Sequence, residues 1–319
     1  MVGSGIRGRG RAVGSRIPGY LPAVNVLVTG GSGFVGREIV RQLLVAGHAV
    51  RVLARGVKAA AERVEFVKGS VLEPASLDAA CAGCEGVIHL VGIISEVGHQ
   101  TYERVHTEGT RNLLAAAKGA GVSRFVHMSA LGTRPNAVSR YHRSKWLAEE
   151  AVRASGLAWT VFRPSLIYGP GDGFVNLFAR MSRWSPVLPV IGHGLGLLQP
   201  VPVAEVARCF VGALVEPRSV GQTLDVCGPE PLTFVAVLDE ILAATHRRRW
   251  KLHLPLPLAR LQARFLEFVF PALLGQAPPL NRDQILMLDE DNVGDPWPAA
   301  ELFGYAPAPF PESLRQFLK

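Results

Sequence analysis

The stretch TGGSGFVGRE at residues 29–38 places Gly30, Gly33 and Gly36 at three-residue spacing. It directly follows the apolar run VNVLV at 24–28 and leads into REIVRQLLVAG at 37–47, which has a helical period. Glycines between a strand and a helix let the chain turn tightly and bring backbone N–H groups close to a pyrophosphate at the helix N-terminus. The stretch therefore predicts the phosphate-binding turn of a dinucleotide site.

Apolar runs and helical periods alternate along the rest of the chain. Strands are expected at 49–55, 86–92, 124–130 and 157–165, and a helix at 110–121. This alternation predicts βαβ units, and hence an α/β Rossmann fold with a doubly wound parallel sheet. We expect a Rossmann NAD(P)-binding domain at 24–172 plus about 197–230. A smaller, mostly helical C-terminal substrate or partner domain is expected at about 173–196 plus 231–319.

The first 23 residues differ in composition from the rest. Arginines stand there among glycines, and no acidic residue occurs before Glu38. We expect a disordered basic extension, although a targeting segment is also rich in arginine and poor in acids.

The formal net charge of +8 indicates an anionic partner, such as a dinucleotide, a membrane surface or nucleic acid. A basic stripe interleaved with aromatic residues is missing from the sequence, so nucleic acid is not expected. Residues 185–204 are apolar, but their four prolines would break a spanning helix, and a loop is predicted there.

The cysteines argue against a metal site. Cys81 and Cys84 form a lone CxxC without a second pair or nearby histidines, so we expect both thiols to pack in the core and no metal to bind. Four scattered cysteines fit a reducing cytoplasm, with peripheral attachment to the inner face of the membrane as a further option.

The end of the second strand bears on which dinucleotide binds. A site that prefers NAD places Asp or Glu there to hold the ribose 2′-hydroxyl. This strand instead ends Leu53-Ala54-Arg55, and Arg37 follows the third glycine of the turn. Two cations without a carboxylate favour the 2′-phosphate of NADP(H) over NAD(H).

Tyr141 and Lys145 form a YxxxK pair four residues apart, about one helical turn. A lysine ammonium beside a phenol favours the phenolate, which predicts Tyr141 as the acid/base for a carbonyl or carbinol. Ser129, just after the strand RFVHM, is expected to polarise the same oxygen.

Together with the segment from Arg163-Pro164 to Asp172, these motifs resemble the extended or atypical short-chain dehydrogenases, the NAD-dependent epimerase/dehydratase superfamily. The stretches HTEGTRNLLAAAKGAGVSRFVHMSALG, YHRSKWLAEE and QPVPVAEVA resemble, more narrowly, bacterial relatives of the 39-kDa NADPH-binding accessory subunit of respiratory complex I. The resemblance implies that Lys145 and Pro164 lie near the nicotinamide and its ribose. The complete set expected to contact the cofactor is Gly30, Ser32, Gly33, Phe34, Val35, Gly36, Arg37, Arg55, Leu90, Gly92, Lys145 and Pro164.

Three positions depart from the superfamily pattern. Ser70 stands where Asp usually contacts adenine, His106 stands where Asn is common, and the catalytic serine aligns with either Ser129 or Ala130. His106, Phe174 and Asn176 are expected to line the substrate or partner pocket. Residues 185–204 carry no Lys or Arg for a substrate diphosphate, which disfavours a nucleotide sugar.

Two functions remain open on the sequence. The first is an oxidoreductase acting on a small or lipophilic carbonyl, or on a quinone-like molecule. The second is a non-catalytic NADPH-binding accessory or assembly subunit of a membrane-associated respiratory complex. The helical period at 255–271 places Leu261, Phe265 and Phe268 on one face, which either lies on an anionic membrane or closes the pocket. Packing against the pocket is favoured, because most amphipathic helices pack.

Overall fold

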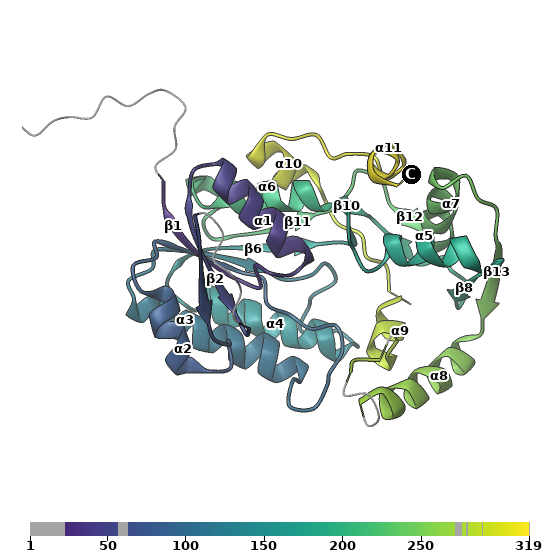
Figure 1. Cartoon of the computed structure of the whole chain (residues 1–319), viewed down its shortest axis with the longest axis horizontal. Helices are drawn as coiled ribbons and strands as arrows, with labels where there is room; N and C mark the ends of the chain where they lie inside the picture. Colours follow the sequence, from purple (N-terminus) through teal and green to yellow (C-terminus); the bar gives the residue numbers. More distant parts are fainter. Residues whose placement is uncertain (1–22, 57–62, 272–275, 279, 289, 319) are drawn as a thin grey trace, which may run out of the picture.

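A computed structural model of the chain describes residues 23–56, 63–271, 276–278, 280–288 and 290–318 (Figure 1). The basic extension expected at 1–23 lies outside the described residues, apart from Ala23.

A seven-stranded parallel sheet forms the centre of the molecule, in the order β11-β6-β5-β4-β1-β2-β3. Its strands are β1 (Asn25–Thr29), β2 (Ala49–Ala54), β3 (Val64–Lys68), β4 (Gly86–His89), β5 (Arg124–Met128), β6 (Ala158–Pro164) and β11 (Gln222–Val226). The chain order reverses between β1 and β4, which is the switch point where doubly wound sheets bind ligands. The predicted Rossmann fold is confirmed. The edge strands β3 and β11 were not among the predicted strands.

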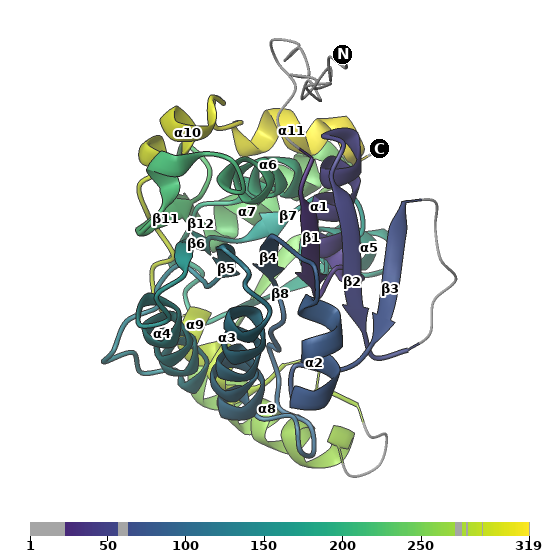
Figure 2. The same ribbon diagram turned by 90° about the vertical axis from the view of Figure 1, so that its left-hand side faces the viewer.

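Helices cover both faces of this sheet, as Figure 2 shows. One face carries α1 (Phe34–Val45), α6 (Val203–Ala213) and α10 (Trp297–Phe303), packed on the side chains of Val26, Val28 and Ile88. The other carries α2 (Pro74–Cys81), α3 (Gly109–Gly119) and α4 (Arg140–Arg153), packed on Leu27, Val87 and Phe125. The central strands β1, β4 and β5 are therefore buried on both sides, which explains their largely apolar sequences.

The cysteines pack as predicted. Cys81 and Cys84 are free and buried in the core beneath α2 and α3. Burial raises the pKa of the Cys81 thiol to about 12, so this thiol is neutral and unreactive.

The segment 185–204, predicted to be a loop, contains regular structure, and that prediction was wrong. It forms β8 (Val187–Ile191), β9 (Leu197–Leu198) and β10 (Val201–Pro202), and α6 begins at Val203. Pro189 and Pro202 are tolerated because β8 and β10 lie in two-stranded sheets, where an N–H can be missing at a free edge, and Pro186 and Pro200 lie outside the strands. None of the helices in the described part of the chain is both long and apolar enough to cross a membrane.

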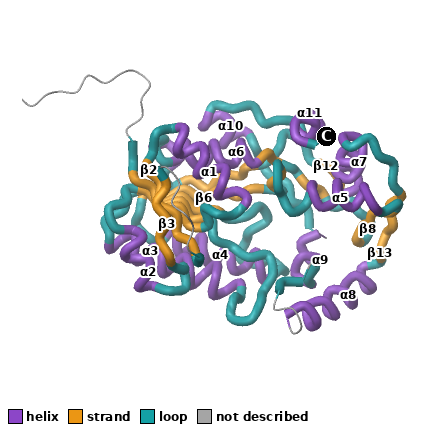
Figure 3. Tube along the Cα trace, in the orientation of Figure 1, coloured by secondary structure: helices purple, strands orange, loops and turns teal. Residues whose placement is uncertain are grey.

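A smaller group of elements lies beyond the carboxyl ends of the large sheet (Figure 3). Here α5 (Val175–Trp184), α7 (Phe234–Ala244) and α11 (Phe310–Phe317) enclose a second core around Phe178, Phe234 and Leu238. Strand β13 (Trp250–Leu254) pairs with β8 and runs into α8 (Leu256–Val269), which packs on α9 (Arg282–Leu288). The remaining elements are β7 (Ile167–Tyr168), β12 (Leu232–Thr233), the π-helix η1 (Glu103–Glu108) and the short helix η2 (Pro217–Ser219).

Candidate dinucleotide and substrate site

The glycine-rich turn brings backbone into close contact at the switch point. A Cβ on Gly36 would lie 2.2 Å from the carbonyl oxygen of Gly30, so α1 can pack on the turn only with glycine there. Gly30 itself has a φ of +79°, and a Cβ on it would lie 3.2 Å from the backbone of Leu90. Gly33 is the N-cap of α1 and offers no side chain to its free N–H groups. The first turn of α1 is therefore open to an anionic ligand.

A cavity of about 320 Å³ lies beside this turn. Six of the predicted cofactor residues line it: Gly30, Ser32, Gly33, Arg55, Leu90 and Gly92. Its other lining residues are Leu53, Ala54, Gly69, Ser70, Val71, Leu72, Val91, Ile93, Gln100 and Val105. Among all of these described residues, Arg55 is the one that carries a charge.

Both arginines expected at the cofactor are exposed near this cavity. Nη1 of Arg55 donates to Oε1 of Gln100 at 3.3 Å, and Nε of Arg37 donates to the carbonyl oxygen of Ser32 at 3.2 Å. Within the described residues, neither guanidinium forms an ion pair. Both therefore remain able to bind an anion. Phe34 and Val35 lie in the first turn of α1, and Pro164 ends β6.

Lys145 lies at the end of the same cavity. Its side chain is buried, and Nζ donates to the carbonyl oxygen of Met128 at 2.8 Å. A Cβ on Gly92, which lines the cavity, would lie 3.4 Å from this Nζ and 3.4 Å from Nε2 of His106. Burial lowers the pKa of Lys145 to about 8. The ammonium thus lies next to the dinucleotide cavity.

Tyr141, one turn before Lys145, packs among aromatic rings. Its ring meets those of Tyr102 and His106 edge-on, with centroids 5.9 and 5.3 Å away. Burial raises the pKa of Tyr141 to about 12, which is opposite to the direction expected from Lys145. The phenol is therefore protonated at neutral pH. Its hydroxyl forms no hydrogen bond within the described residues, so it is available to a substrate.

His106 is held in place from both ring nitrogens. Nε2 accepts from the N–H of Ile93 at 3.0 Å, so the proton lies on Nδ1, which donates to Oγ of Ser144 at 2.8 Å. The Ser144 hydroxyl in turn donates to the carbonyl oxygen of Tyr141 at 2.7 Å. Burial, together with the charge on Lys145, lowers the pKa of His106 to about 2. His106 is a neutral residue that links η1 to α4, and its ring packs against that of Tyr141.

The side chains of the other three predicted site residues form hydrogen bonds or ring contacts with groups other than Tyr141 and Lys145. Ser129 is buried after β5, and its Oγ donates to Oγ1 of Thr133 at 3.4 Å. Phe174 packs with Phe178 and Phe234 in the second core. The side chain of Asn176 donates to the carbonyl oxygen of Gly169 and to Asp172, which holds the turn before α5.

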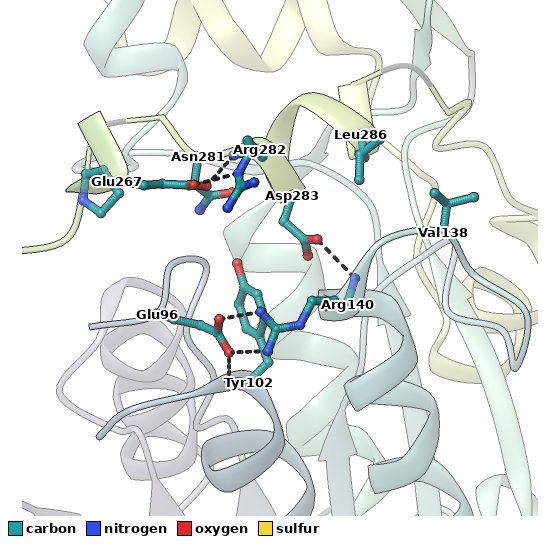
Figure 4. A pocket seen from close by; sticks show the side chains of 10 residues that line it. Glu96, Tyr102, Val138, Arg140, Glu267, Asn281, Arg282, Asp283 and Leu286 are labelled. Atoms are coloured by element: carbon teal, nitrogen blue, oxygen red, sulfur yellow. Dashed lines mark hydrogen bonds and ion pairs between the residues drawn. The ribbon is translucent and has the colours of Figure 1, made fainter. Parts of the chain in front are cut away.

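A second cavity, of about 530 Å³, opens between the Rossmann domain and α9 (Figure 4). Tyr102 lies in its wall, and both arginines around it are paired with carboxylates: Arg140 with Glu96, and Arg282 with Glu267. Asp283 of α9 accepts from the backbone N–H groups of Arg140 and Tyr141 at 3.0 and 2.7 Å. Tyr102 and Asp283 were not among the site residues predicted from the sequence, because no local motif marks either one.

Comparison with known proteins agrees with this geometry. Residues 30–178 match the family described as NAD(P)H-binding. A ceramide reductase from Caulobacter vibrioides is 39% identical over 172 residues, which are 53% of this chain and 54% of that protein. Subunit 9 of the NADH dehydrogenase [ubiquinone] 1 alpha subcomplex from Arabidopsis thaliana is 31% identical over 280 residues, 83% of this chain and 68% of that protein. The chain thus spans about half the length of the first relative and two thirds of the second.

Solved structures share the fold at lower identity. A dTDP-glucose 4,6-dehydratase from Streptomyces venezuelae, solved with NAD bound, superposes with a TM-score of 0.71 at 22% identity, covering 92% of this chain and 95% of that one. A UDP-glucose 4-epimerase from Thermotoga maritima gives 0.71 at 21% identity, covering 92% and 97%. This chain belongs to the same protein family as subunit 9 of the NADH dehydrogenase alpha subcomplex, and its residues 30–178 carry the NAD(P)H-binding match.

Proposed function

We propose that this protein is an NADP(H)-dependent oxidoreductase that transfers hydride to or from a small or lipophilic carbonyl or carbinol. The observation that carries the proposal is the closeness of the Lys145 ammonium to the wall of the dinucleotide cavity, with Tyr141 on the same helix. Gly92 lines that cavity and is in close contact with Lys145, which is one helical turn from Tyr141. The bound dinucleotide would supply or accept the hydride.

Tyr141 is the proton donor in the direction of carbonyl reduction. A phenol with a pKa raised to about 12 carries its proton at neutral pH and can release it to a developing alkoxide. Lys145 holds a positive charge beside the cavity, anchored by the Met128 carbonyl. That charge stabilises negative charge on the phenolate and on the substrate oxygen as the proton moves. Ser129 is the proposed hydrogen-bond donor to the carbonyl oxygen, which requires its hydroxyl to turn from Thr133 to the substrate.

The preference for NADP(H) rests on charge. A 2′-phosphate needs cations, whereas the 2′-hydroxyl of NAD needs a carboxylate at the end of β2. The described lining of the cavity carries Arg55 and no carboxylate, and Arg37 lies at the start of α1. Both guanidinium groups retain free N–H donors for a phosphate.

The proposed substrate is lipophilic or small rather than a nucleotide sugar. Residues 185–204 provide no Lys or Arg for a diphosphate, and both arginines that line the second cavity are already paired with carboxylates. Two relatives carry names that refer to such substrates, a ceramide reductase and a 2-alkyl-3-oxoalkanoate reductase from Stenotrophomonas maltophilia. Quinone-like molecules belong in the same test panel.

The test follows NADPH absorbance against a panel of long-chain ketones, aldehydes and quinones. The proposal predicts substrate-dependent oxidation in the wild type that Tyr141→Phe reduces at least a hundredfold, while NADPH binding is retained. Tyr305→Phe is the matched control, because this tyrosine contacts Cys209 of α6, on the face of the sheet opposite α4. A wild-type protein that binds NADPH but oxidises it with no member of the panel would contradict the proposal.

A second candidate function is supported by the subunit 9 relatives, which match most of this chain. In that function NADPH is a structural ligand of an accessory or assembly subunit in a respiratory complex. His106, whose hydrogen bonds are all used within the fold, fits a static role as well as a catalytic one. Co-purification with the complex, together with tightly held NADPH that never turns over, distinguishes this function from catalysis.

A further inference from the structure

Helix α8 exposes its large apolar side chains. Leu258, Leu261, Phe265 and Phe268 are 53%, 65%, 64% and 76% exposed and recur at helical spacing on one face. The opposite face packs through Ala259 and Ala263, both fully buried. The sequence favoured packing of the large face against the pocket, and the structure contradicts this. Small alanines allow close approach to α9, so the bulky residues point away from the protein.

The neighbouring strand continues the apolar exposure. Trp250 and Leu252 of β13 are 80% and 54% exposed, and β13 runs directly into α8 (Figure 1). Trp184, also 80% exposed, lines one surface hollow together with Trp250, Arg183, Arg248 and Arg249. Two exposed tryptophans beside arginines are typical of side chains that sit at a membrane–water interface.

Cations flank the apolar face of α8. Arg260 and Arg264 lie between the exposed face and the buried one, and neither forms an ion pair within the described residues. The one carboxylate of the helix, Glu267, is paired with Arg282. This face of the helix therefore combines apolar side chains with unneutralised positive charge.

We propose that α8 and the start of β13 bind the surface of an anionic lipid bilayer. Phe265 and Phe268 would enter the interfacial region while Arg260 and Arg264 contact lipid phosphates. A second copy of the chain fits this face less well, since two such helices would bring like charges together. A bilayer satisfies both the apolar and the cationic part of the surface.

This attachment places the second cavity at the membrane. Glu267 of α8 lines that cavity, which also contains Tyr102, and the ring of Tyr102 packs against Tyr141. A lipophilic substrate held in the bilayer would then be concentrated close to this cavity. This consequence rests on the proposed oxidoreductase function, whereas the membrane binding itself does not.

The test is sedimentation of the full-length protein with vesicles of phosphatidylcholine, with and without phosphatidylglycerol. We expect binding to the anionic vesicles that falls at least tenfold in Phe265→Gln/Phe268→Gln and in Arg260→Gln/Arg264→Gln. Val45→Gln is the matched control, because Val45 is 78% exposed on α1 and away from α8. Unchanged NADPH binding shows that the variants are folded.

Three results would overturn the proposal. They are no binding to anionic vesicles, binding that neither double variant weakens, or a dimer in solution that Phe265→Gln/Phe268→Gln abolishes. Vesicle binding is measured without nucleotide or substrate, so an absence of vesicle binding leaves the oxidoreductase proposal intact. Loss of turnover in Tyr141→Phe likewise says nothing about lipid binding.

Discussion

The carboxylate of Asp283 accepts a hydrogen bond from the backbone N–H of Tyr141 at 2.7 Å, across 142 residues of sequence. The same carboxylate accepts from the N–H of Arg140, and the Ser139 hydroxyl accepts from that of His142. Three of the four free N–H groups that begin α4 are thereby satisfied. The helix that carries Tyr141 and Lys145 is thus fixed by a side chain of α9.

Asp283→Ala is expected to lower the free energy of unfolding by about 1–2 kcal/mol, because it removes a helix cap. It should also lower kcat more than it raises KM, because α4 loses the contact that orients Tyr141. Urea unfolding and steady-state kinetics with NADPH measure the two effects. Asp295→Ala removes a comparable carboxylate that accepts from the N–H of Trp297, and should change stability alone. Equal kinetics in the two variants would exclude Asp283 as a positioning residue.

Gly36→Ala is expected to abolish NADPH binding, since the new methyl would lie 2.2 Å from the Gly30 carbonyl oxygen and force α1 away from the turn. Gly119→Ala is the control, because a Cβ there meets nothing within 4 Å. Fluorescence titration with NADPH and thermal melts of both variants check this. Binding within twofold of the wild type in Gly36→Ala would show that the turn does not hold the dinucleotide.

Arg55→Gln and Arg37→Gln are each expected to weaken NADPH binding at least tenfold and NADH binding much less. A charged hydrogen bond to phosphate contributes about 1.5–3 kcal/mol, and NADH lacks that phosphate. Arg41→Gln is the control, since Arg41 is exposed on α1 and pairs with Glu38. Calorimetric titration with both nucleotides gives the ratio, and parallel losses for NADPH and NADH would refute the NADP(H) preference.

Stability should depend on pH through Lys145. Burial lowers its pKa to about 8 in the folded protein, below its usual value, so the unfolded chain binds the proton more tightly. The contribution of Lys145 to the free energy of unfolding therefore rises as the pH rises above about 8. It stops rising once the unfolded chain has also lost this proton. Urea unfolding of wild type and Lys145→Met between pH 7 and 10 isolates this contribution. A constant difference between the two would show that Lys145 does not titrate in this range.

The parts of the site that sequence could predict are local ones. Gly30, Gly33 and Gly36 belong to one turn, and Tyr141 and Lys145 to one turn of helix, so their spacing determines their geometry. The contact of Asp283 with α4 depends on how α9 docks, which no local pattern encodes.

The surroundings of a side chain could not be predicted from the sequence either. The direction of the Tyr141 pKa shift follows from the rings packed around it, not from its spacing to Lys145. For α8, periodicity shows two faces but not which one packs. The alanine face proved to be the inner one, and the larger face stays exposed.

The central claim is that Tyr141 and Lys145 turn a dinucleotide site into a catalytic one. Its most direct test supplies NADPH deuterated at C4 with a long-chain ketone and measures deuterium on the carbinol carbon by mass spectrometry. The account predicts one deuterium per product in the wild type, and at least a hundredfold slower labelling in Tyr141→Phe with NADPH affinity unchanged. Equal labelling in wild type and Tyr141→Phe, or none from a protein saturated with NADPH across the panel, would contradict it.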